Sequence, residues 1–228
     1  MTTLAVLNNG FLASGDSIGV INIWDTNNSS AIRTISGYST GVRSLTVLKN
    51  GCLVSSGTEI KIWNTNDGSL ITPTPTGYSS TVFGMTVLQN SFLAVGSSMD
   101  NLIKIWNGAD LKGTLIGHTD WVRSLAVLQN GYLASGSDDK TVRIWNTTDG
   151  GLMRNLTGHN GSVYALAVLK NGYLASGSTD ATIKIWNTDT GSLITTLKGH
   201  LRDVNALAAL LSGYFASGSE DGTIKIWN

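Results

Sequence analysis

Short apolar runs alternate with turn residues along the whole chain, and no run is long enough to predict a helix. Residues 117–157 show the pattern: WVRSLAVL at 121–128, YLASGS at 132–137, TVRIW at 141–145 and LMRNL at 152–156. An Asn-Gly pair, which suits the positive φ of a tight turn, separates the first two runs. Four short apolar runs joined by tight turns predict a four-stranded antiparallel sheet.

This unit recurs six times, with a period of about 40 residues that marks a repeat array. The third run of each copy ends on a tryptophan, at Trp24, Trp63, Trp106, Trp145, Trp186 and Trp227. The runs are apolar without clean alternation, which indicates that both faces of each sheet are covered. Similar sheets stacked face to face satisfy this requirement, so the sequence predicts an all-β, six-bladed β-propeller with four-stranded antiparallel blades.

The periodicity has no break, which predicts a single domain over residues 1–228. The expected blades cover approximately 1–36, 37–76, 77–116, 117–157, 158–198 and 199–228. The sixth repeat ends after its third run, so we expect the last blade to lack its outer strand. TIKIW at 223–227 would then be an uncovered apolar edge, which is a hazard for unwanted strand pairing. The two prolines, Pro73 and Pro75, are placed in the fourth, outer strand of the second blade, because proline belongs at a sheet edge.

Composition excludes several classes of function. Lys plus Arg equals Asp plus Glu, at 15 each, so the chain has no basic excess for binding nucleic acid. No apolar run approaches the length of a membrane span, and the N-terminus lacks the basic flank and apolar core of a signal peptide. Cys52 is the only cysteine, which excludes an internal disulfide and fits a reducing compartment. We therefore expect a cytoplasmic protein that binds neither nucleic acid nor membranes.

The combination of Gly-His, Ser-Gly-Ser, an aspartate before the third run and a terminal tryptophan resembles the WD40 repeat family over the whole chain. This resemblance implies a hydrogen-bonded tetrad of His, Ser, Asp and Trp in each intact blade, in which the indole donates to the serine and the imidazole links the serine to the aspartate. Three repeats supply all four residues. The implied tetrads are His118, Ser135, Asp139 and Trp145; His159, Ser176, Asp180 and Trp186; and His200, Ser217, Asp221 and Trp227.

The first three repeats depart from this pattern. The first has Ile18 where the aspartate belongs, and the second has Tyr38 in place of the histidine and a shortened turn without an aspartate. The third has Tyr78 in place of the histidine and Val95 in place of the serine, although Asp100 remains. We expect lower local stability in blades one to three than in blades four to six.

The sequence gives no sign of catalysis, of a metal site or of a cofactor. The only histidines are His118, His159 and His200, one in each blade, and equivalent positions in successive blades cannot converge on one ion. The aspartates of the tetrads recur in the same way, so an acid-base pair is not expected. Cys52 has no histidine in its own repeat, which argues against a reactive thiol. The expected protein is non-enzymatic.

The positions at which the repeats disagree are the candidates for partner binding. They flank a constant valine in the first strand of each blade from the second onward, and the resemblance implies that this side is the top rim, where the family usually binds its partners. The candidates are Arg43, Phe83, Trp121, Arg123, Tyr164, Asp203 and Asn205. Trp, Tyr and Arg are frequent at interface hot spots. Trp121 is the only tryptophan outside the repeat-ending position and is therefore the first candidate; drift at exposed positions after duplication is the alternative.

These observations leave three hypotheses open. The first is a scaffold that binds a protein or peptide on the top face, and the second is a sensor or regulatory module of a larger signalling protein. The third is a structural or engineered repeat protein with no partner, which would suit the near-identical C-terminal repeats. The incomplete last blade favours a monomeric closed ring, with a dimer through the open edge or membership of a longer chain as the alternatives.

Overall fold

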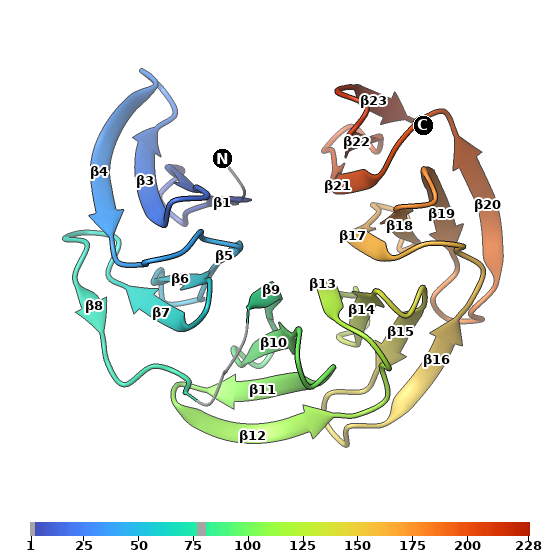
Figure 1. The fold of residues 1–228 in the computed structure, drawn as a ribbon, viewed down its shortest axis with the longest axis horizontal. Helices are drawn as coiled ribbons and strands as arrows, with labels where there is room; N and C mark the ends of the chain where they lie inside the picture. Colours follow the sequence, from blue (N-terminus) through green and yellow to red (C-terminus); the bar gives the residue numbers. More distant parts are fainter. Residues whose placement is uncertain (1–2, 77–80) are drawn as a thin grey trace. The chain divides into compact units, whose positions relative to one another are not determined.

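The computed structural model describes residues 3–76 and 81–228, which form strands, turns and bends and contain no helix (Figure 1). The strands make six separate antiparallel sheets, five with four strands and the last with three. The chain divides into two compact units, residues 1–113 and 114–228, and each is described by itself. The single domain over residues 1–228 stays a prediction.

The first unit holds three sheets, in which successive strands are hydrogen-bonded neighbours. The first blade consists of β1 (Thr3–Val6), β2 (Leu12–Gly15), β3 (Val20–Asp25) and β4 (Ser30–Ser36). The second consists of β5 (Ser44–Val47), β6 (Leu53–Ser56), β7 (Ile60–Trp63) and β8 (Leu70–Ile71). The third consists of β9 (Val82–Val87), β10 (Leu93–Ser97), β11 (Ile103–Asn107) and β12 (Asp110–Leu115), whose last two residues belong to the second unit.

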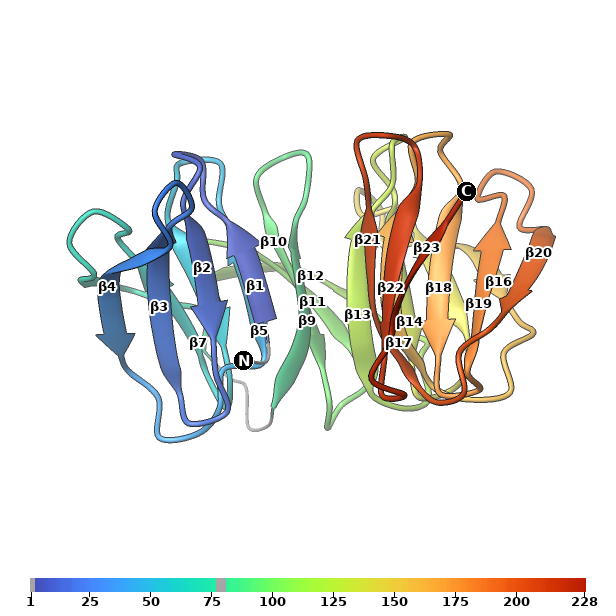
Figure 2. The same ribbon diagram turned by 90° about the horizontal axis from the view of Figure 1, so that it is seen from above.

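The second unit repeats this arrangement. The fourth blade consists of β13 (Val122–Val127), β14 (Leu133–Ser137), β15 (Val142–Trp145) and β16 (Leu152–Leu156). The fifth consists of β17 (Val163–Val168), β18 (Leu174–Ser178), β19 (Thr182–Trp186) and β20 (Leu193–Lys198). The last consists of β21 (Val204–Ala209), β22 (Phe215–Ser219) and β23 (Ile224–Trp227), which lie side by side in Figure 2.

Asn-Gly turns join the first two strands of the fourth and fifth blades, as the sequence predicts. Gly131 has a φ of 87° and Gly172 a φ of 86°, a region in which a side chain is strained. The Asn130 side chain closes the first of these turns by accepting a hydrogen bond from the Tyr132 amide at 3.1 Å. The turn therefore brings β13 and β14 into register.

The core of the second unit lies between neighbouring blades. Every residue of β14 and β18 is buried, which explains why these strands read as continuous apolar or small runs. Val142, Ile144 and Trp186 pack in one cluster with Leu174 and Val163 of the fifth blade. Burial on both faces fixes the register of the second strands, because a one-residue slip would exchange the two faces.

The predicted strands of the fourth blade agree with the observed ones to within one residue at each end. The placement of the two prolines is wrong. Strand β8 ends at Ile71, and Pro73 and Pro75 follow it rather than lying within it. Proline has no N–H to donate to the ladder, so the strand stops short of both. Cys52 lies one residue before β6 and is half-buried.

Candidate interaction site

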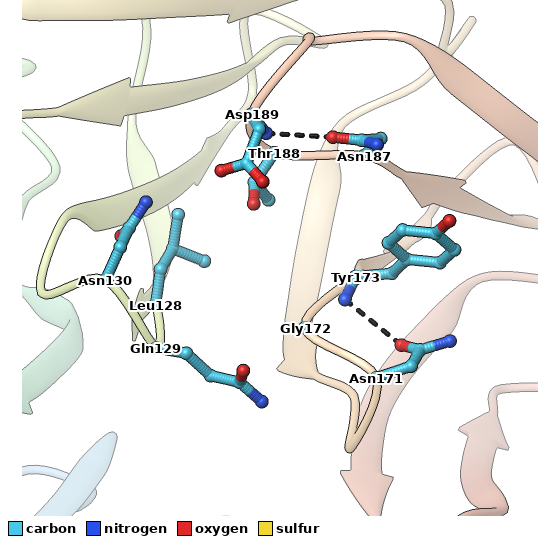
Figure 3. A pocket seen from close by; sticks show the side chains of 9 residues that line it. All are labelled: Leu128, Gln129, Asn130, Asn171, Gly172, Tyr173, Asn187, Thr188 and Asp189. Carbon is cyan, nitrogen blue, oxygen red and sulfur yellow. Dashed lines mark hydrogen bonds between the residues drawn. The ribbon is translucent and has the colours of Figure 1, made fainter.

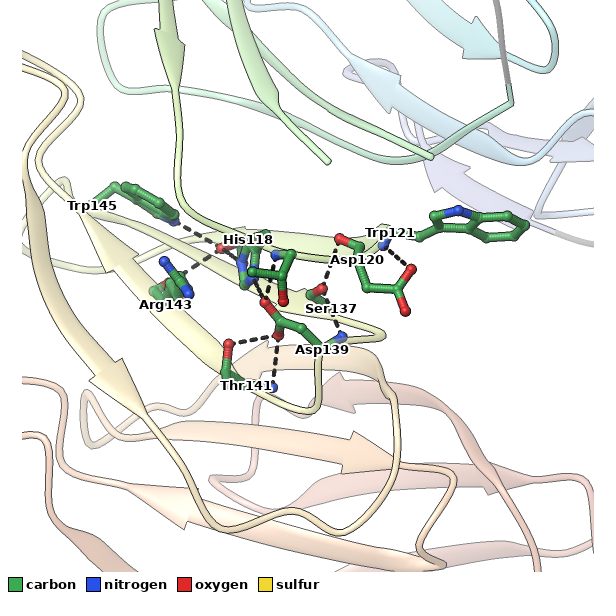
Figure 4. A network of polar contacts seen from close by, with 10 residues as sticks. His118, Asp120, Trp121, Ser137, Asp139, Thr141, Arg143 and Trp145 are labelled. Carbon is green, nitrogen blue, oxygen red and sulfur yellow. Dashed lines mark hydrogen bonds and ion pairs between the residues drawn. The ribbon is translucent and has the colours of Figure 1, made fainter. Parts of the chain in front are cut away.

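The fourth-blade tetrad takes its residues from two strands and two connecting segments: Ser135 from β14, Trp145 from β15, Asp139 from the turn between them and His118 from the segment before β13. Figure 4 shows His118, Asp139 and Trp145 in this network. Trp145 Nε1 donates to Ser135 Oγ at 2.8 Å, and Ser135 Oγ lies 2.7 Å from His118 Nε2. His118 Nδ1 is 2.6 Å from Asp139 Oδ2. This series of hydrogen bonds connects the end of β15 to the middle of β14 and to the turn that follows β14.

The fifth and last blades contain the same chain of hydrogen bonds. His159 Nε2 lies 2.8 Å from Ser176 Oγ, and His159 Nδ1 lies 2.8 Å from Asp180 Oδ2. In the last blade, His200 Nε2 is 2.6 Å from Ser217 Oγ. The corresponding indoles, Trp186 and Trp227, both donate to their serine at 2.8 Å. All three tetrads implied by the resemblance are therefore formed.

The direction of these hydrogen bonds assigns a protonation state to the histidine. Because the Trp186 indole can only donate, Ser176 accepts from it. The Ser176 hydroxyl proton has two acceptors in reach, His159 Nε2 at 2.8 Å and the Lys184 carbonyl at 3.5 Å, and the shorter contact favours His159. Nδ1 of the neutral ring then carries the proton and donates it to Asp180. Burial lowers the pKa of His159, although Asp180 opposes this shift. The neutral ring is the stable form in the folded protein.

The aspartates of the tetrads are held in the ionised form. Burial would raise the pKa of Asp180, but hydrogen bonds from Thr182, from the Asn160 amide and from His159 outweigh it and bring the pKa to about 2. The pKa of Asp139 is likewise well below its usual range, because hydrogen bonds from His118 and Thr141 outweigh the effect of burial. Each carboxylate therefore serves as a permanent acceptor for its turn.

In the first unit, the equivalent hydrogen-bond networks contain fewer residues than the complete tetrads. Trp24 Nε1 donates to Ser14 Oγ at 2.8 Å, as in the complete tetrads. In the second blade the Tyr38 hydroxyl takes the place of the imidazole and lies 2.7 Å from Ser55 Oγ, which accepts from the Trp63 indole at 2.6 Å. Burial raises the pKa of the Tyr38 hydroxyl above its usual value, so the hydroxyl stays protonated at ordinary pH.

In the third blade Val95, in place of the serine, is fully buried among apolar neighbours. Asp100 does not face a histidine; its carboxylate pairs with Lys104 at 2.8 Å. Tyr78 lies outside the described residues. The third blade therefore fills the serine position by apolar packing rather than by a hydrogen bond.

All three histidines have a structural role in the tetrads. Both ring nitrogens of each histidine are engaged, so none of them is available to a metal or a substrate. Within residues 3–76 and 81–228, no three His, Cys, Asp or Glu side chains are grouped as metal ligands would be. In the same residues no helix could cross a membrane.

Three of the predicted contact residues form one cluster in the second unit. The Arg123 guanidinium lies over the Trp121 ring, 4.6 Å from its centroid, and 5.1 Å from the centroid of Tyr164 in the next blade. Asp138 completes the cluster, because Arg123 Nε donates to it at 2.9 Å and the terminal nitrogen donates at 2.6 Å. Trp121 keeps 41% of its surface exposed.

This geometry changes the role expected of Arg123. The sequence suggested an arginine anchor, but the guanidinium is bound to a carboxylate at its head and faces aromatic rings. Its charge is thereby matched within the protein. The Arg123 guanidinium thus lies near the rings of both Trp121 and Tyr164, and the Trp121 side chain remains exposed.

Hydrogen bonds hold the backbone beneath Trp121. The Asp138 amide donates to the Trp121 carbonyl at 2.9 Å, and Ser137 Oγ donates to the Asp120 carbonyl at 3.0 Å. The Trp121 amide donates to the Asp120 carboxylate at 2.8 Å (Figure 4). The indole is therefore presented on a fixed segment at the start of β13.

The other predicted contact residues have different surroundings. Asp203 precedes β21 and is half-buried, and Asn205 is exposed within β21 of the last blade. Arg43, which is exposed, and Phe83, which is half-buried, belong to the first unit.

Sequence reasoning missed Asp138. Arg123 is the extra residue of a bulge between Val122, which pairs with Ser137, and Ser124, which pairs with Gly136. Asp138 follows Ser137, and its amide donates to the Trp121 carbonyl.

Two cavities open at the other ends of the strands. One, of about 230 Å³, lies among turns of the fourth and fifth blades, and the asparagine side chains that line it close their own turns (Figure 3). The other, of about 550 Å³, lies in the first unit beside Cys52, Ile71 and Trp106. It adjoins the point at which the outer strand β8 stops after two residues.

Comparison with known families decides which class of repeat this is. The model described as "WD domain, G-beta repeat" matches residues 71–107, 109–146, 150–187 and 191–228, which is more than half of the chain. The chain belongs to the WD40 family. The matches begin after the first repeats, where the motif departs most from the pattern. No curated protein sequence matches the chain.

Solved structures support the same assignment. The WD40 β-propeller domain of Doa1 is 25% identical, with a TM-score of 0.88 over 99% of this chain and 78% of that one. The computationally designed protein Ika8 is 31% identical, with a TM-score of 0.81 over 99% of this chain and 70% of that one. The fold is that of an all-β, six-bladed WD40 propeller whose last blade has three strands.

Proposed function

We propose that this WD40 protein is a non-catalytic interaction module that binds a protein or peptide through the surface around Trp121. WD40 propellers typically serve as interaction scaffolds and are generally not catalytic. The observation that supports the proposal is the cluster of Trp121, Arg123, Tyr164 and Asp138, in which a large aromatic ring stays exposed on a fixed support.

The physical argument rests on the entropy of binding. An exposed side chain that is free to rotate loses that freedom when a partner immobilises it. Arg123 already lies over the Trp121 ring, and Asp138 holds the guanidinium in place. Much of the ordering has therefore occurred before a partner arrives, and the large indole surface can contribute to affinity.

The similarity to a computationally designed propeller favours a second candidate, a repeat protein whose only property is its fold. Under this hypothesis, the residues around Trp121 would be surface drift with no partner. The two candidates differ in whether the Trp121 surface selects any ligand.

Selection from a random peptide display library on the immobilised protein tests the proposal. A selected peptide should bind Trp121→Ala about 30-fold more weakly than wild type, corresponding to a hot-spot loss of about 2 kcal/mol. Tyr214→Ala is the matched control, because Tyr214 is an aromatic residue of similar exposure, 46%, in the same unit. Fluorescence polarisation gives the affinities, and circular dichroism establishes that each variant is folded.

Two results would contradict the proposal. Peptides that bind Trp121→Ala as tightly as wild type would place the binding surface elsewhere. A library that yields no enriched peptide would favour the protein without a partner. Unfolding of Trp121→Ala would instead assign the indole to the core, and Tyr164→Ala would then provide the second test of the same surface.

A further inference from the structure

One position of the repeat, directly after the turn between the first two strands of a blade, differs in the second blade alone. Five of the six repeats carry an aromatic residue there, and the second repeat carries Cys52. The five aromatic residues are Phe11, Phe92, Tyr132, Tyr173 and Tyr214. Cys52 therefore puts a small thiol at a position where the rest of the chain keeps a six-membered ring.

This aromatic ring has the same surroundings in both units. Tyr132 packs against the buried cluster that contains Ile144 of its own blade and Leu174 and Trp186 of the next blade. Phe11 packs against the cluster that contains the three equivalent residues of the first two blades, which are Ile23, Leu53 and Trp63. An aromatic ring is thus the regular cover of an isoleucine, a leucine and a tryptophan where two blades meet.

Between the second and third blades, the same three positions line a cavity instead. We name it the Cys52 cavity, and its inner wall consists of Cys52, Ile62, Leu93 and Trp106. The cavity at the equivalent place between the fourth and fifth blades is lined by turn residues (Figure 3) and does not reach the corresponding residues, which are Tyr132, Ile144, Leu174 and Trp186. Replacement of the ring by a thiol therefore extends the Cys52 cavity inward to the apolar core.

The two cavities have the same frame but different volumes. Gln129 Nε2 donates to the Lys170 carbonyl at 3.4 Å beside the cavity of the second unit. Lys49 Nζ donates to the Gln89 carbonyl, the equivalent partner, beside the Cys52 cavity. The volumes are about 230 Å³ in the second unit and about 550 Å³ for the Cys52 cavity. Only the Cys52 cavity falls within the range of roughly 300–1,000 Å³ that is typical of small-molecule sites.

The rest of the lining suits an uncharged molecule. Ile71, Thr72 and Pro73 form the outer wall, at the point where β8 stops. Among the described residues that line the cavity, Lys49 alone carries a charge, and its ammonium group donates to a backbone carbonyl. An apolar wall with a few hydroxyl and amide groups at its edge is the usual composition of a small-molecule site.

We propose that the Cys52 cavity binds a small uncharged aromatic molecule whose ring lies against Ile62, Leu93 and Trp106. The class of ligand is inferred from Phe11 and Tyr132, whose uncharged rings cover the equivalent side chains elsewhere in the chain. Apolar cavities hold water poorly and take up small aromatic molecules. A ring beside the Trp106 indole also gains the contacts that aromatic pairs make beyond the burial of apolar surface.

The space left by the missing ring creates this site, and the thiol takes no part in binding. The site is also independent of the proposed interaction surface, because the Cys52 cavity belongs to the first unit and Trp121 belongs to the second. A test of one therefore leaves the other unaffected.

NMR titration of the ¹⁵N-labelled protein with p-cresol tests the proposal, since p-cresol is the free molecule that corresponds to a tyrosine side chain. It should cause saturable shifts of the Trp106 indole N–H and of the Cys52 and Leu93 amides. Indole is a second aromatic probe of larger size. The saturated analogue 4-methylcyclohexanol is the matched probe and should bind about fivefold more weakly than p-cresol, because it lacks the aromatic contacts.

Two variants of Cys52 separate the space from the thiol. Cys52→Tyr restores the residue of the other repeats, fills the cavity and should abolish the saturable shifts. Cys52→Ala removes the thiol but keeps the space, so it should bind p-cresol as wild type does. Trp121→Ala should also bind p-cresol like wild type, which distinguishes this site from the proposed interaction surface.

A measurement on wild-type protein covers the case in which Cys52→Tyr does not fold. Cys52 is the only cysteine, so iodoacetamide labels a single site that mass spectrometry can follow. At ten times its dissociation constant, p-cresol should slow this alkylation about tenfold, because the bound ring covers the thiol. The same concentration of 4-methylcyclohexanol should slow it only about threefold.

Four results would overturn the proposal. The first is that neither p-cresol nor indole causes saturable shifts in wild-type protein. The second is equal affinity for p-cresol and 4-methylcyclohexanol, which would remove the preference for an aromatic ring. The third is folded Cys52→Tyr that binds p-cresol as tightly as wild type, and the fourth is alkylation of Cys52 that saturating p-cresol does not slow.

Discussion

At the scale of single residues, the same side-chain types play two separate roles. The histidines and aspartates of the complete tetrads are buried and satisfied, and they hold turns in place. The charged pair Arg123 and Asp138 instead supports an exposed aromatic ring. A titratable side chain in this protein is therefore informative only when its partners are known, since residue type alone suggests chemistry that the geometry does not provide.

The fifth-blade tetrad predicts a loss of stability in acid. His159 has a native pKa below its usual 6.5, so the unfolded chain binds a proton first as the pH falls through 6.5. Asp180 has a native pKa of about 2 against a usual 3.8, and its contribution is lost as the pH falls from about 3.8 to 2. Both effects lower the free energy of unfolding as the pH decreases.

Urea unfolding at a series of pH values measures this dependence. The free energy of unfolding should be highest near neutral pH and should fall below 6.5. In His159→Gln, which does not titrate, the slope between pH 7 and 5 should be smaller than in wild type. An equal slope in the two proteins would show that His159 is not responsible.

At the scale of elements, the joints between blades explain why some glycines are required. Gly177 permits close approach of the next blade, whereas within the second unit a Cβ atom added to Gly218 would meet only Ala206, at 3.7 Å. Neither residue has a positive φ, so what distinguishes them is space rather than backbone conformation.

The two glycines form a matched pair for mutation. Gly177→Ala should lower the free energy of unfolding by about 1–3 kcal/mol, because the new methyl group would overlap Val204. Gly218→Ala should change it by no more than about 0.5 kcal/mol, because its methyl group would make an ordinary contact with Ala206. Chemical denaturation at a concentration at which both variants are monomers measures the difference. Equal losses would mean that close packing does not distinguish the two positions.

At the scale of the whole molecule, the complete tetrads are confined to residues 114–228. Within the described part of residues 1–113, the serine of the first blade accepts a hydrogen bond from Trp24, and the serine of the second blade is hydrogen-bonded to Trp63 and Tyr38. The third blade has the buried Val95 in place of the serine. Each net hydrogen bond contributes about 1 kcal/mol, and the chains of the second unit contain more of them. The two units should therefore differ in local stability.

Native-state hydrogen exchange tests this expectation. Amides of β6 and β10 in the first unit should exchange with opening free energies about 1–3 kcal/mol below those of β14 and β18. These four strands occupy equivalent central positions in their blades, which makes the comparison direct. Equal protection of all four would show that Tyr38 and Val95 replace the missing residues without loss.

Much of this structure could be predicted from the sequence, because the repeat is read six times. The turns and the strand bounds of the fourth blade follow from patterns that recur, and the resemblance to the WD40 family implies the three tetrads. What could not be predicted depends on residues that do not recur. Tyr38 replaces an imidazole through its hydroxyl, and β8 stops before the prolines. The Arg123 to Asp138 pair occurs once, because the corresponding positions of the fifth and last blades do not carry an arginine with an aspartate.

The contact between a glycine of one blade and a valine of the next also bears on how such a chain can change in length. In the second unit Gly136 faces Val163, and Gly177 faces Val204. Both contacts use the same residue types at equivalent positions, so neither is specific to one pair of blades. An in-frame duplication of residues 158–198 would create a new boundary with Gly177 on one side and another copy of Val163 on the other. That combination repeats the contact between Gly136 and Val163, so unequal recombination can add a blade without inventing a new interface.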